Sequence, residues 1–345
     1  MSTTEISAAY YKGSKQFEIA KIMAPPPLAG EVQIRTAYVG ICGTDLHAFH
    51  GRMDTRIGCN RIIGHEMSGI VENVGEGVRH LKPGQHVVVR PLAHCSECPA
   101  CKSGLQHICH NLKFLGLDTD GAFQQLWTVP EYTVHQIPES LPLECAALIE
   151  PVSVACHGVS RSRLQAGENV LVIGGGPIGL LIAMVAKHAG GNIIISEVSE
   201  ARLAIAKKLG FKVLNPSQQD IVASVMTETN ARGVDVIFEV SGTQPGVDTM
   251  TKIAASRARI VMTAIHSEKR PIDLFQFFWR EIELIGARVY THEDYEKAIE
   301  LVTNGAIDTG TIITDVGSLE NIQQAFEALE GNPTAMKSLI KVADW

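Results

Sequence analysis

The sequence predicts an α/β protein with two domains, one rich in β-strands and one built on a doubly wound parallel sheet. The chain has 345 residues, which at the usual domain size corresponds to about two domains. Short strands separated by Gly and Pro fill the first part, and strands alternate with helices after Pro151. A glycine cluster at residues 174–179 stands between the first strand and the first helix of the alternating part.

The composition is that of a globular chain. Apolar residues make up 45%, charged residues 19%, and the formal net charge is −7, which excludes a disordered protein. No basic run occurs, so no nucleic-acid partner is expected. The most apolar helical stretch, residues 178–186, falls well short of the roughly 20 residues that span a bilayer. Residues 1–15 contain no continuous apolar signal segment, which favours the cytoplasm.

The first part of the chain reads as an irregular antiparallel β domain. Runs of Val, Ile and Tyr predict strands at residues 32–39, 69–74 and 86–90, because β-branched and aromatic side chains favour a pleated backbone. Gly and Pro residues between these runs supply turns. We expect this domain to cover residues 1–155.

The second part alternates strands and helices, which predicts a parallel sheet with right-handed crossovers at residues 156–293. Its predicted strands lie at residues 169–173, 192–196, 234–240 and 259–263. Its first two helices are predicted at residues 178–188 and 199–209 from their periodicity. The tail returns to mixed texture, with a predicted helix at 295–304 and short strands at 312–313 and 339–342.

The glycine cluster fits the dinucleotide fingerprint G-x-G-x-x-G, with glycines at Gly174, Gly176 and Gly179 and with Pro177 and Ile178 between the last two. It follows an apolar strand and opens a helix, which is the context that the motif requires. The first glycine permits the tight turn, the second lets the backbone approach a pyrophosphate, and the third lets helix and strand pack closely. An ordinary glycine turn is the alternative interpretation.

Glu197 ends the second strand, near the spacing of about 20 residues expected for an acid that binds ribose hydroxyls. A carboxylate at this place accepts hydrogen bonds from ribose and repels a 2′-phosphate, which favours NAD over NADP. A solvated surface acid is the alternative. Arg202 is close enough to contact a 2′-phosphate or to lie over the adenine.

Four of the eight cysteines are concentrated in one short segment, at Cys95, Cys98, Cys101 and Cys109. Four thiolates at such short separations close a tetrahedral shell, which predicts a structural zinc site. The spacing lacks the additional proline and second-cluster pattern of ferredoxins, so zinc is favoured over an iron–sulfur cluster. Four free thiols in a loop are the alternative.

A catalytic zinc needs three protein ligands and an exchangeable position. Three segments offer ligands, namely Cys42, the Gly-His-Glu run with His65 and Glu66, and Glu150 before Pro151. Taken singly, each has an ordinary interpretation as a buried cysteine, a core histidine or a surface acid. Their spacing alone does not unite them.

The order of these motifs resembles the zinc-dependent medium-chain dehydrogenase/reductase family, and the resemblance covers essentially the whole chain. Within the family, the sequence is most similar to the polyol branch, which includes sorbitol, xylitol, butanediol and galactitol-phosphate dehydrogenases, and to threonine dehydrogenase. The resemblance implies a GroES-like catalytic domain at residues 1–155, to which residues 294–345 return, and a Rossmann NAD-binding domain at residues 156–293.

The resemblance also assigns roles at the catalytic zinc. Cys42 and His65 match zinc ligands, and Glu66 matches an acid that coordinates directly or through water. Glu150 stands where alcohol dehydrogenases of the family carry a ligand cysteine, which leaves open which glutamate holds the metal. Thr44 and His47 match a proton relay, and the intervening Asp45 fits a structural acid.

The activity implied is transfer of a hydride from a secondary alcohol, a polyol or vicinal diol, to NAD. L-threonine 3-dehydrogenase is the alternative activity, and an NAD-binding structural or sensor protein is the non-enzymatic one. By family analogy, the substrate cleft has candidate residues for which simple packing is an equal alternative: Phe49, residues 115–117 and Tyr290. The resemblance also implies a homodimer or homotetramer, because members of this family usually form dimers or tetramers in which the edges of the Rossmann sheets pair between subunits.

Overall fold

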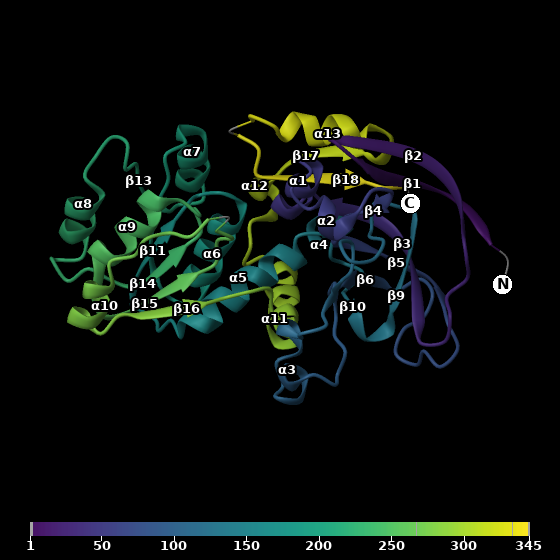
Figure 1. The fold of residues 1–345 in the computed structure, drawn as a ribbon, viewed down its shortest axis with the longest axis horizontal. Helices are drawn as coiled ribbons and strands as arrows, with labels where there is room; N and C mark the ends of the chain where they lie inside the picture. Colours follow the sequence, from purple (N-terminus) through teal and green to yellow (C-terminus); the bar gives the residue numbers. More distant parts are fainter. Residues whose placement is uncertain (1–2, 267, 333, 344–345) are drawn as a thin grey trace. The chain divides into compact units, whose positions relative to one another are not determined.

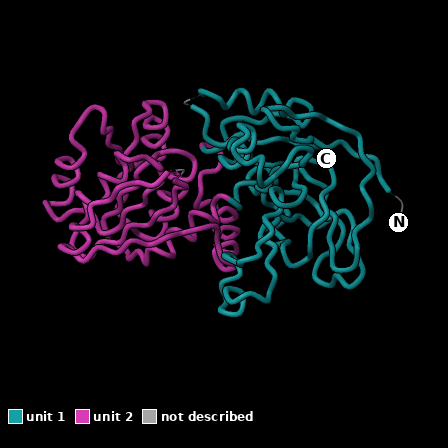
Figure 2. The backbone as a smooth tube through the Cα atoms, in the orientation of Figure 1, with its two compact units in different colours: residues 1–150, 312–345 teal, residues 151–311 magenta. Residues whose placement is uncertain are grey.

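The computed structural model describes residues 3–343 apart from residues 267 and 333. It divides into two compact units (Figure 2). Unit 1 comprises residues 1–150 and 312–345, and unit 2 comprises residues 151–311. Among the described residues, no helix has the length and apolar character needed to cross a membrane.

Unit 1 is built on two sheets (Figure 1). The larger has seven strands in the order β10-β6-β5-β3-β18-β17, with β9 also paired to β3. Its strands are β3 (Glu31–Gly40), β5 (Glu66–Val74), β6 (His86–Val89), β9 (Leu126–Pro130), β10 (Val134–Gln136), β17 (Ile313–Ser318) and β18 (Lys337–Lys341). All pairings in it are antiparallel except β17 with β18. The second sheet has the order β2-β1-β4, with strands β1 (Thr4–Gly13), β2 (Gln16–Ala24) and β4 (Arg61–Ile62).

Short helices and one small hairpin connect these strands. The helices are α1 (Gly43–Phe49), α2 (Asp54–Ile57), α3 (Pro99–Lys102), α4 (Leu143–Ala146) and α13 (Ile322–Leu329), with single turns η1 (Gln106–Ile108), η2 (Glu131–Thr133) and η3 (Leu319–Asn321). The hairpin pairs β7 (Leu92–Ala93) with β8 (Lys113–Phe114). An aromatic cluster of Phe17, Phe49, Phe123 and Phe326 packs in the core of this unit.

Unit 2 is a six-stranded parallel sheet in the order β13-β12-β11-β14-β15-β16. The strands are β11 (Asn169–Ile173), β12 (Asn192–Ser196), β13 (Lys212–Leu214), β14 (Val234–Glu239), β15 (Ala254–Met262) and β16 (Glu283–Gly286). The helices are α5 (Ile149–Ser162), which begins at the unit boundary, α6 (Pro177–His188), α7 (Glu200–Lys208), α8 (Ile221–Glu228), α9 (Gln244–Ile253), α10 (Leu274–Arg280), α11 (His292–Thr303) and α12 (Thr309–Ile312). The strand order reverses between β11 and β14, which is where doubly wound sheets bind nucleotides.

The boundaries between the units differ from those expected from sequence. Helix α11 stays in unit 2, because its residue Asp294 accepts a hydrogen bond from the His157 ring of α5 at 2.6 Å. Tyr290 and Tyr295 are fully buried, with ring centroids 5.5 Å apart, and anchor the same helix. The chain therefore returns to unit 1 at residue 312 and not at 294, and it first leaves at 151 and not at 156. The predicted strand at 312–313 is wrong in part, because Ile312 ends helix α12 and only Ile313 begins β17.

Asp294 is expected to contribute measurably to stability. It forms a capping box with Thr291 at the N-terminus of α11, and it also accepts a hydrogen bond from His157. Burial alone raises the pKa of Asp294, but hydrogen bonds from His157 and Thr291 outweigh it and hold that pKa below its usual value. Asp294→Ala should therefore lower the free energy of unfolding by about 2 kcal/mol at neutral pH.

Because the folded-state pKa is depressed, this contribution is present above the unfolded pKa of about 3.9 and disappears as the pH falls through the folded value. Denaturant unfolding of both proteins across this pH range measures the difference. Glu300→Ala removes an exposed pair with Lys297 on the same helix and should change stability by less than about 1 kcal/mol. Equal effects of the two substitutions would contradict the assignment.

Candidate active site and metal centres

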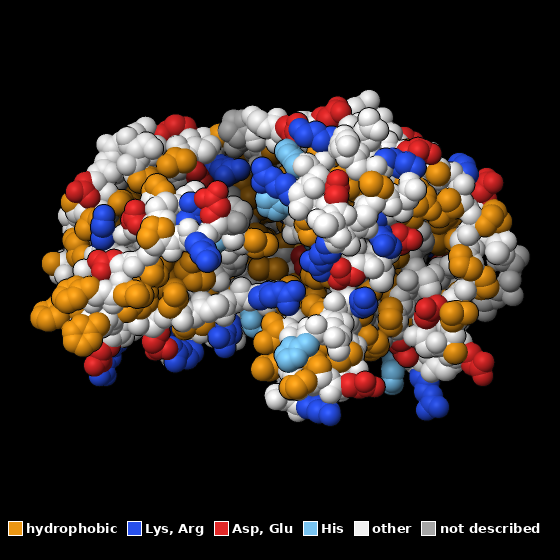
Figure 3. Space-filling view, viewed as in Figure 1, with side chains coloured by type: hydrophobic (Ala, Val, Ile, Leu, Met, Phe, Trp, Pro, Cys, Tyr) orange, Lys and Arg blue, Asp and Glu red, His pale blue; other side chains and the backbone are white. Residues whose placement is uncertain are grey.

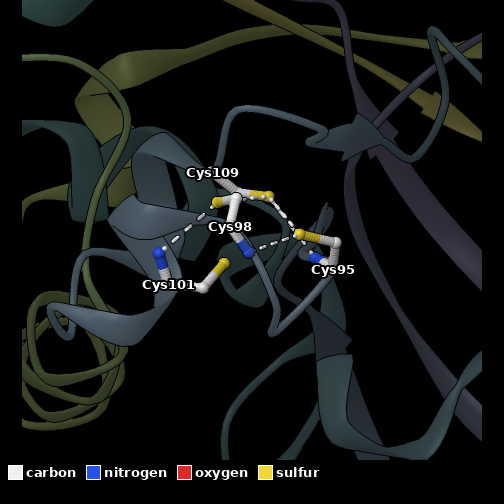
Figure 4. A group of neighbouring side chains, drawn as sticks. All are labelled: Cys95, Cys98, Cys101 and Cys109. Carbon is white, nitrogen blue, oxygen red and sulfur yellow. Dashed lines mark hydrogen bonds between the residues drawn. The ribbon is translucent and has the colours of Figure 1, made fainter.

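The four clustered cysteines lie in the loop between β7 and β8, and their side chains converge (Figure 4). Cys98 caps α3, with Pro99 at the first helical position, so the chain turns back and brings all four sulfurs together. The Sγ atoms of Cys109 and Cys95 are 3.5 Å apart, and those of Cys98 and Cys109 are 3.8 Å apart. A zinc–sulfur distance of about 2.3 Å gives a tetrahedral edge of about 3.8 Å, so the arrangement fits a zinc ion.

Backbone N–H groups prepare this lobe for anionic sulfur. N–H groups of Glu97 and Cys98 lower the pKa of Cys95 to about 6, and those of Cys101 and His110 lower the pKa of Cys98. Burial raises the pKa of Cys101 to about 12. A metal must therefore displace a proton from Cys101, which couples binding to pH.

A second group of possible ligands is formed by Cys42, His65 and Glu66, whose ligating atoms lie within 4.8 Å of one another. Cys42 is the N-cap of α1, and Glu66 is the first residue of β5. His65 and Glu66 are buried, with 2% and 1% exposure. The loop that contains Gly116 packs directly against the Gly64 backbone next to His65, since a side chain at Gly116 would overlap the Gly64 carbonyl. One sulfur, one nitrogen and one oxygen are the donor set of a zinc site with an open position.

Asp45, in the first turn of α1, contacts both Cys42 and His65. Its Oδ2 accepts a hydrogen bond from the Cys42 N–H at 2.9 Å, and its Oδ1 lies 3.6 Å from His65 Nδ1. Burial lowers the pKa of His65 when taken alone, but the charge of Asp45 and the Cys42 contact raise it to about 10. The field around the imidazole therefore favours a cation. Asp45 itself is fully buried, which raises its pKa.

Glu150 is buried at the start of α5 and stands outside the 4.8 Å group. Its charge contributes to the raised pKa values of both His65 and Lys337, so its carboxylate lies within electrostatic range of each. The structure thus brings together three of the four predicted ligands and places the fourth nearby.

Lys337 is a site residue that the sequence analysis missed. It lies at the start of β18, is 3% exposed, and its Nζ is 2.7 Å from each carboxylate oxygen of Glu66. Burial alone lowers the pKa of Lys337, but Glu66 and Cys42 raise it above its usual value. A single lysine near the end of the chain gives no motif, so only the fold reveals it.

The predicted relay residues Thr44 and His47 are three residues apart on α1, which places them on one side of the helix. Arg52 Nη1 is 3.5 Å from His47 Nδ1. Partial burial lowers the pKa of His47, and the charges of Arg52 and His50 lower it further. The imidazole is therefore neutral at pH 7 and able to accept a proton.

The residues considered for a substrate cleft are largely packed. Phe49 is fully buried against Phe17 and Phe326, and Tyr290 is fully buried against Tyr295. Leu115 and Leu117 are also buried. The Phe114 ring meets the His65 ring edge-on at 5.1 Å and so supports the metal-ligand segment.

The glycine fingerprint forms a turn at the switch point of unit 2. Gly174 has φ +107°, which side-chain-bearing residues rarely adopt, and any side chain at Gly179 would overlap the Gly174 carbonyl. Pro177 is the first residue of α6, so the helix N-terminus opens beside the turn. This is the cradle that a pyrophosphate requires.

The predicted acid Glu197 lies beside this turn. Its Oε2 accepts the Gly175 N–H at 2.8 Å, and its Oε1 accepts the Val198 and Ser199 N–H groups. Arg202 Nη1 is 3.9 Å from Glu197 Oε2, so the arginine flanks the acid. Glu197 is therefore fixed beside the glycine turn.

Comparison with known proteins agrees with this arrangement. Residues 28–139 match the alcohol dehydrogenase GroES-like domain, and residues 177–304 match the zinc-binding dehydrogenase domain. The chain is 52% identical to 2-dehydro-3-deoxy-L-galactonate 5-dehydrogenase of Pseudoalteromonas atlantica, over 97% of this chain and 98% of that protein. It is 34% identical to sorbitol dehydrogenase of Bacillus subtilis, over 97% of each chain.

Among solved structures, 2R,3R-butanediol dehydrogenase of Bacillus subtilis matches with a TM-score of 0.90 and 30% identity, over 98% of this chain and 100% of that one. The chain belongs to the zinc-dependent medium-chain dehydrogenase/reductase family. It is an oxidoreductase that acts on secondary alcohols with NAD, which confirms the reaction type and the fold class expected from sequence.

Cys101→Ser should remove the metal of the four-cysteine lobe. A serine hydroxyl stays protonated where a thiolate is required, so zinc should fall from about two ions to about one per chain. Metal analysis of the purified protein measures this, with Cys59→Ser, at an exposed cysteine outside the cluster, as the control. An unchanged zinc content in Cys101→Ser would contradict the assignment.

Proposed function

We propose that this enzyme oxidises the secondary hydroxyl at carbon 5 of a sugar acid of the 2-dehydro-3-deoxy-galactonate type to a ketone, with NAD as hydride acceptor. The observation that carries the proposal is the convergence of Cys42, His65 and Glu66 in a chain that is 52% identical, over nearly its whole length, to a dehydrogenase of that substrate. Such an acid carries neighbouring hydroxyls, so it retains the vicinal diol expected from sequence. A simple polyol is the second candidate, supported by the likeness to sorbitol dehydrogenase.

We assign the residues of the site to metal binding, proton transfer and positioning of a metal ligand. We assign Cys42, His65, Glu66 and Glu150 to the catalytic zinc and the four clustered cysteines to a structural zinc. A catalytic zinc supplies Lewis acidity that lowers the pKa of an alcohol bound to it. Thr44 accepts the proton of the substrate hydroxyl while it gives up its own hydroxyl proton, and the neutral His47 imidazole takes up a proton and releases one towards solvent. Asp45 holds the His65 ring in place, as carboxylates beside metal-binding histidines do.

The cofactor assignment rests on the glycine turn and its acid. The backbone of Gly176 and the start of α6, at Pro177 and Ile178, faces the pyrophosphate, whereas the Gly174 N–H is donated to the Ser196 carbonyl and Pro177 has no N–H. Gly179 allows the helix to approach the turn. Glu197 accepts the ribose hydroxyls and repels a 2′-phosphate, so NAD is preferred over NADP. Arg202 flanks the adenosine side.

We also propose self-association through one edge of the unit 2 sheet. Strand β16 is the last strand of that sheet and is largely exposed. Beside it, α10 presents Leu274, Phe275, Phe278 and Trp279, each at least 60% exposed, and Figure 3 shows hydrophobic side chains gathered over this helix. An exposed edge strand beside apolar surface fits a second copy of the chain in a homodimer or homotetramer. None of the eight cysteines, all of which lie in the described part of the chain, forms a disulfide, and a location in the reducing cytoplasm is consistent with this.

A substrate panel tests the proposed function. The sugar acid, sorbitol, xylitol, galactitol, 2,3-butanediol and L-threonine are each assayed with NAD and with NADP. We expect kcat/KM to be highest for the sugar acid with NAD, by about 10²-fold over the neutral polyols. An enzyme site that pairs with the carboxylate of the sugar acid would have unpaired polar groups when a neutral polyol is bound. A preference for L-threonine or for a neutral polyol would overturn the substrate assignment and leave the reaction type intact.

His47→Ala tests the relay. The pKa of the wild-type imidazole lies below 6.5, so the ring is able to accept a proton at neutral pH. In the variant, removal of the substrate proton depends on hydroxide from solvent. Its kcat should therefore fall by about 10²-fold near neutral pH and recover as the pH rises towards about 9. Zinc content should stay unchanged, and His80→Ala, at an exposed histidine, serves as the control. Loss of zinc, or a deficit independent of pH, would refute the relay role.

A further inference from the structure

Two glutamates crowd the proposed catalytic metal site, and each brings a negative charge. Glu66 is within the 4.8 Å group with Cys42 and His65, and Glu150 lies close enough to raise the pKa of His65. A thiolate and one carboxylate already neutralise a divalent ion, so a second carboxylate adds uncompensated charge in a buried place. Such charge is unfavourable unless it is paired.

Lys337 supplies the pairing charge. Its Nζ is 2.7 Å from Oε1 and 2.7 Å from Oε2 of Glu66, and 3.3 Å from the carbonyl oxygen of Ile41. These three acceptors match the three N–H donors of an ammonium group. The lysine side chain is 4% exposed and that of Glu66 is 1% exposed, so water does not screen the pair.

The Glu66 carboxylate is also fixed on its other side. A side chain at Gly40 would overlap Glu66 Oε2, so this oxygen lies directly against the backbone of β3. Glu66 is therefore confined between β3 and the ammonium group of β18, with both oxygens engaged by Lys337. Any cation at Cys42 and His65 has to share a carboxylate that Lys337 already holds.

We propose that Lys337 is a positioning residue that restrains Glu66 and weakens its hold on the metal, so that the fourth coordination position stays exchangeable. This inference rests on the proposed metal role of Cys42, His65 and Glu66. A carboxylate shared with an ammonium group is a weaker donor, so Glu66 binds the metal less firmly than it would without Lys337. Lys337 touches the carboxylate and not the substrate.

Metal release without substrate tests this. The rate at which a chelator removes catalytic zinc is measured for the wild type and for Lys337→Met, Lys337→Arg, Glu66→Gln and the double variant Glu66→Gln/Lys337→Met. Cobalt replaces zinc in parallel samples, so that its visible spectrum reports coordination. Lys337→Met should release its metal about tenfold more slowly, because the freed Glu66 carboxylate can then bind the metal more firmly. Its cobalt spectrum should shift, its kcat should fall, and Lys337→Arg should restore the wild-type release rate.

The double variant keeps the test decisive if Lys337→Met folds poorly, since it removes both members of the buried pair. Because Lys337 acts through Glu66, adding Lys337→Met to Glu66→Gln should leave the release rate unchanged. Faster or unchanged release in folded Lys337→Met, or an equal effect of Lys337→Met in the Glu66→Gln background, would overturn the proposal. These measurements need no substrate, so their failure is distinct from failure of the sugar-acid assignment.

Discussion

Unit 1 depends on one constraint, which is that charge removed from water must be paired. Asp45, His65, Glu66 and Lys337 are each at least nine-tenths buried, and each faces an opposite charge or a hydrogen-bond partner. Elsewhere such groups would be costly, because an isolated buried charge is strongly unfavourable. Here they converge on the ligand atoms of the proposed metal site. Glu66 begins β5 and Lys337 begins β18, and both strands pair with β3 in one sheet, so the sheet register sets the geometry of this ion pair.

Unit 2 meets a different requirement with backbone atoms. The turn at Gly174 leads into the N-terminus of α6 at the switch point, and Glu197 is held beside this turn by three backbone donors. A phosphate site of this kind depends on close approach of the ligand to the backbone, and side chains at the turn would prevent that approach. Small residues at defined positions therefore carry its specificity.

This contrast explains what could be predicted from the sequence. Strands β11 and β12 have the predicted bounds, because buried parallel strands are short apolar runs. Strand β15 begins at Ala254, five residues before the predicted start at 259. The sequence does not reveal these first residues, because residues 254–258 have little β-propensity and pair with β14 across a shift of register. Local motifs located the glycine turn, the cysteine lobe and the Gly-His-Glu segment. Lys337 escaped notice because its role is defined by a partner distant in the sequence.

The helix that closes unit 2 makes the same point. The periodicity at 295–304 correctly predicts a helix, but the pattern does not say which domain it covers. The His157–Asp294 bond and the buried tyrosines decide that, and both are tertiary contacts. Similarly, packing and not ligand contact accounts for the burial of Phe49.

The pairing of Glu66 with Lys337 joins residues 271 positions apart. During synthesis from the N-terminus, Cys42, His65 and Glu66 leave the ribosome long before strand β18 exists, and the whole of unit 2 is made in between. The charge of Glu66 is therefore paired only after β18 has been made and has joined β3 in the sheet.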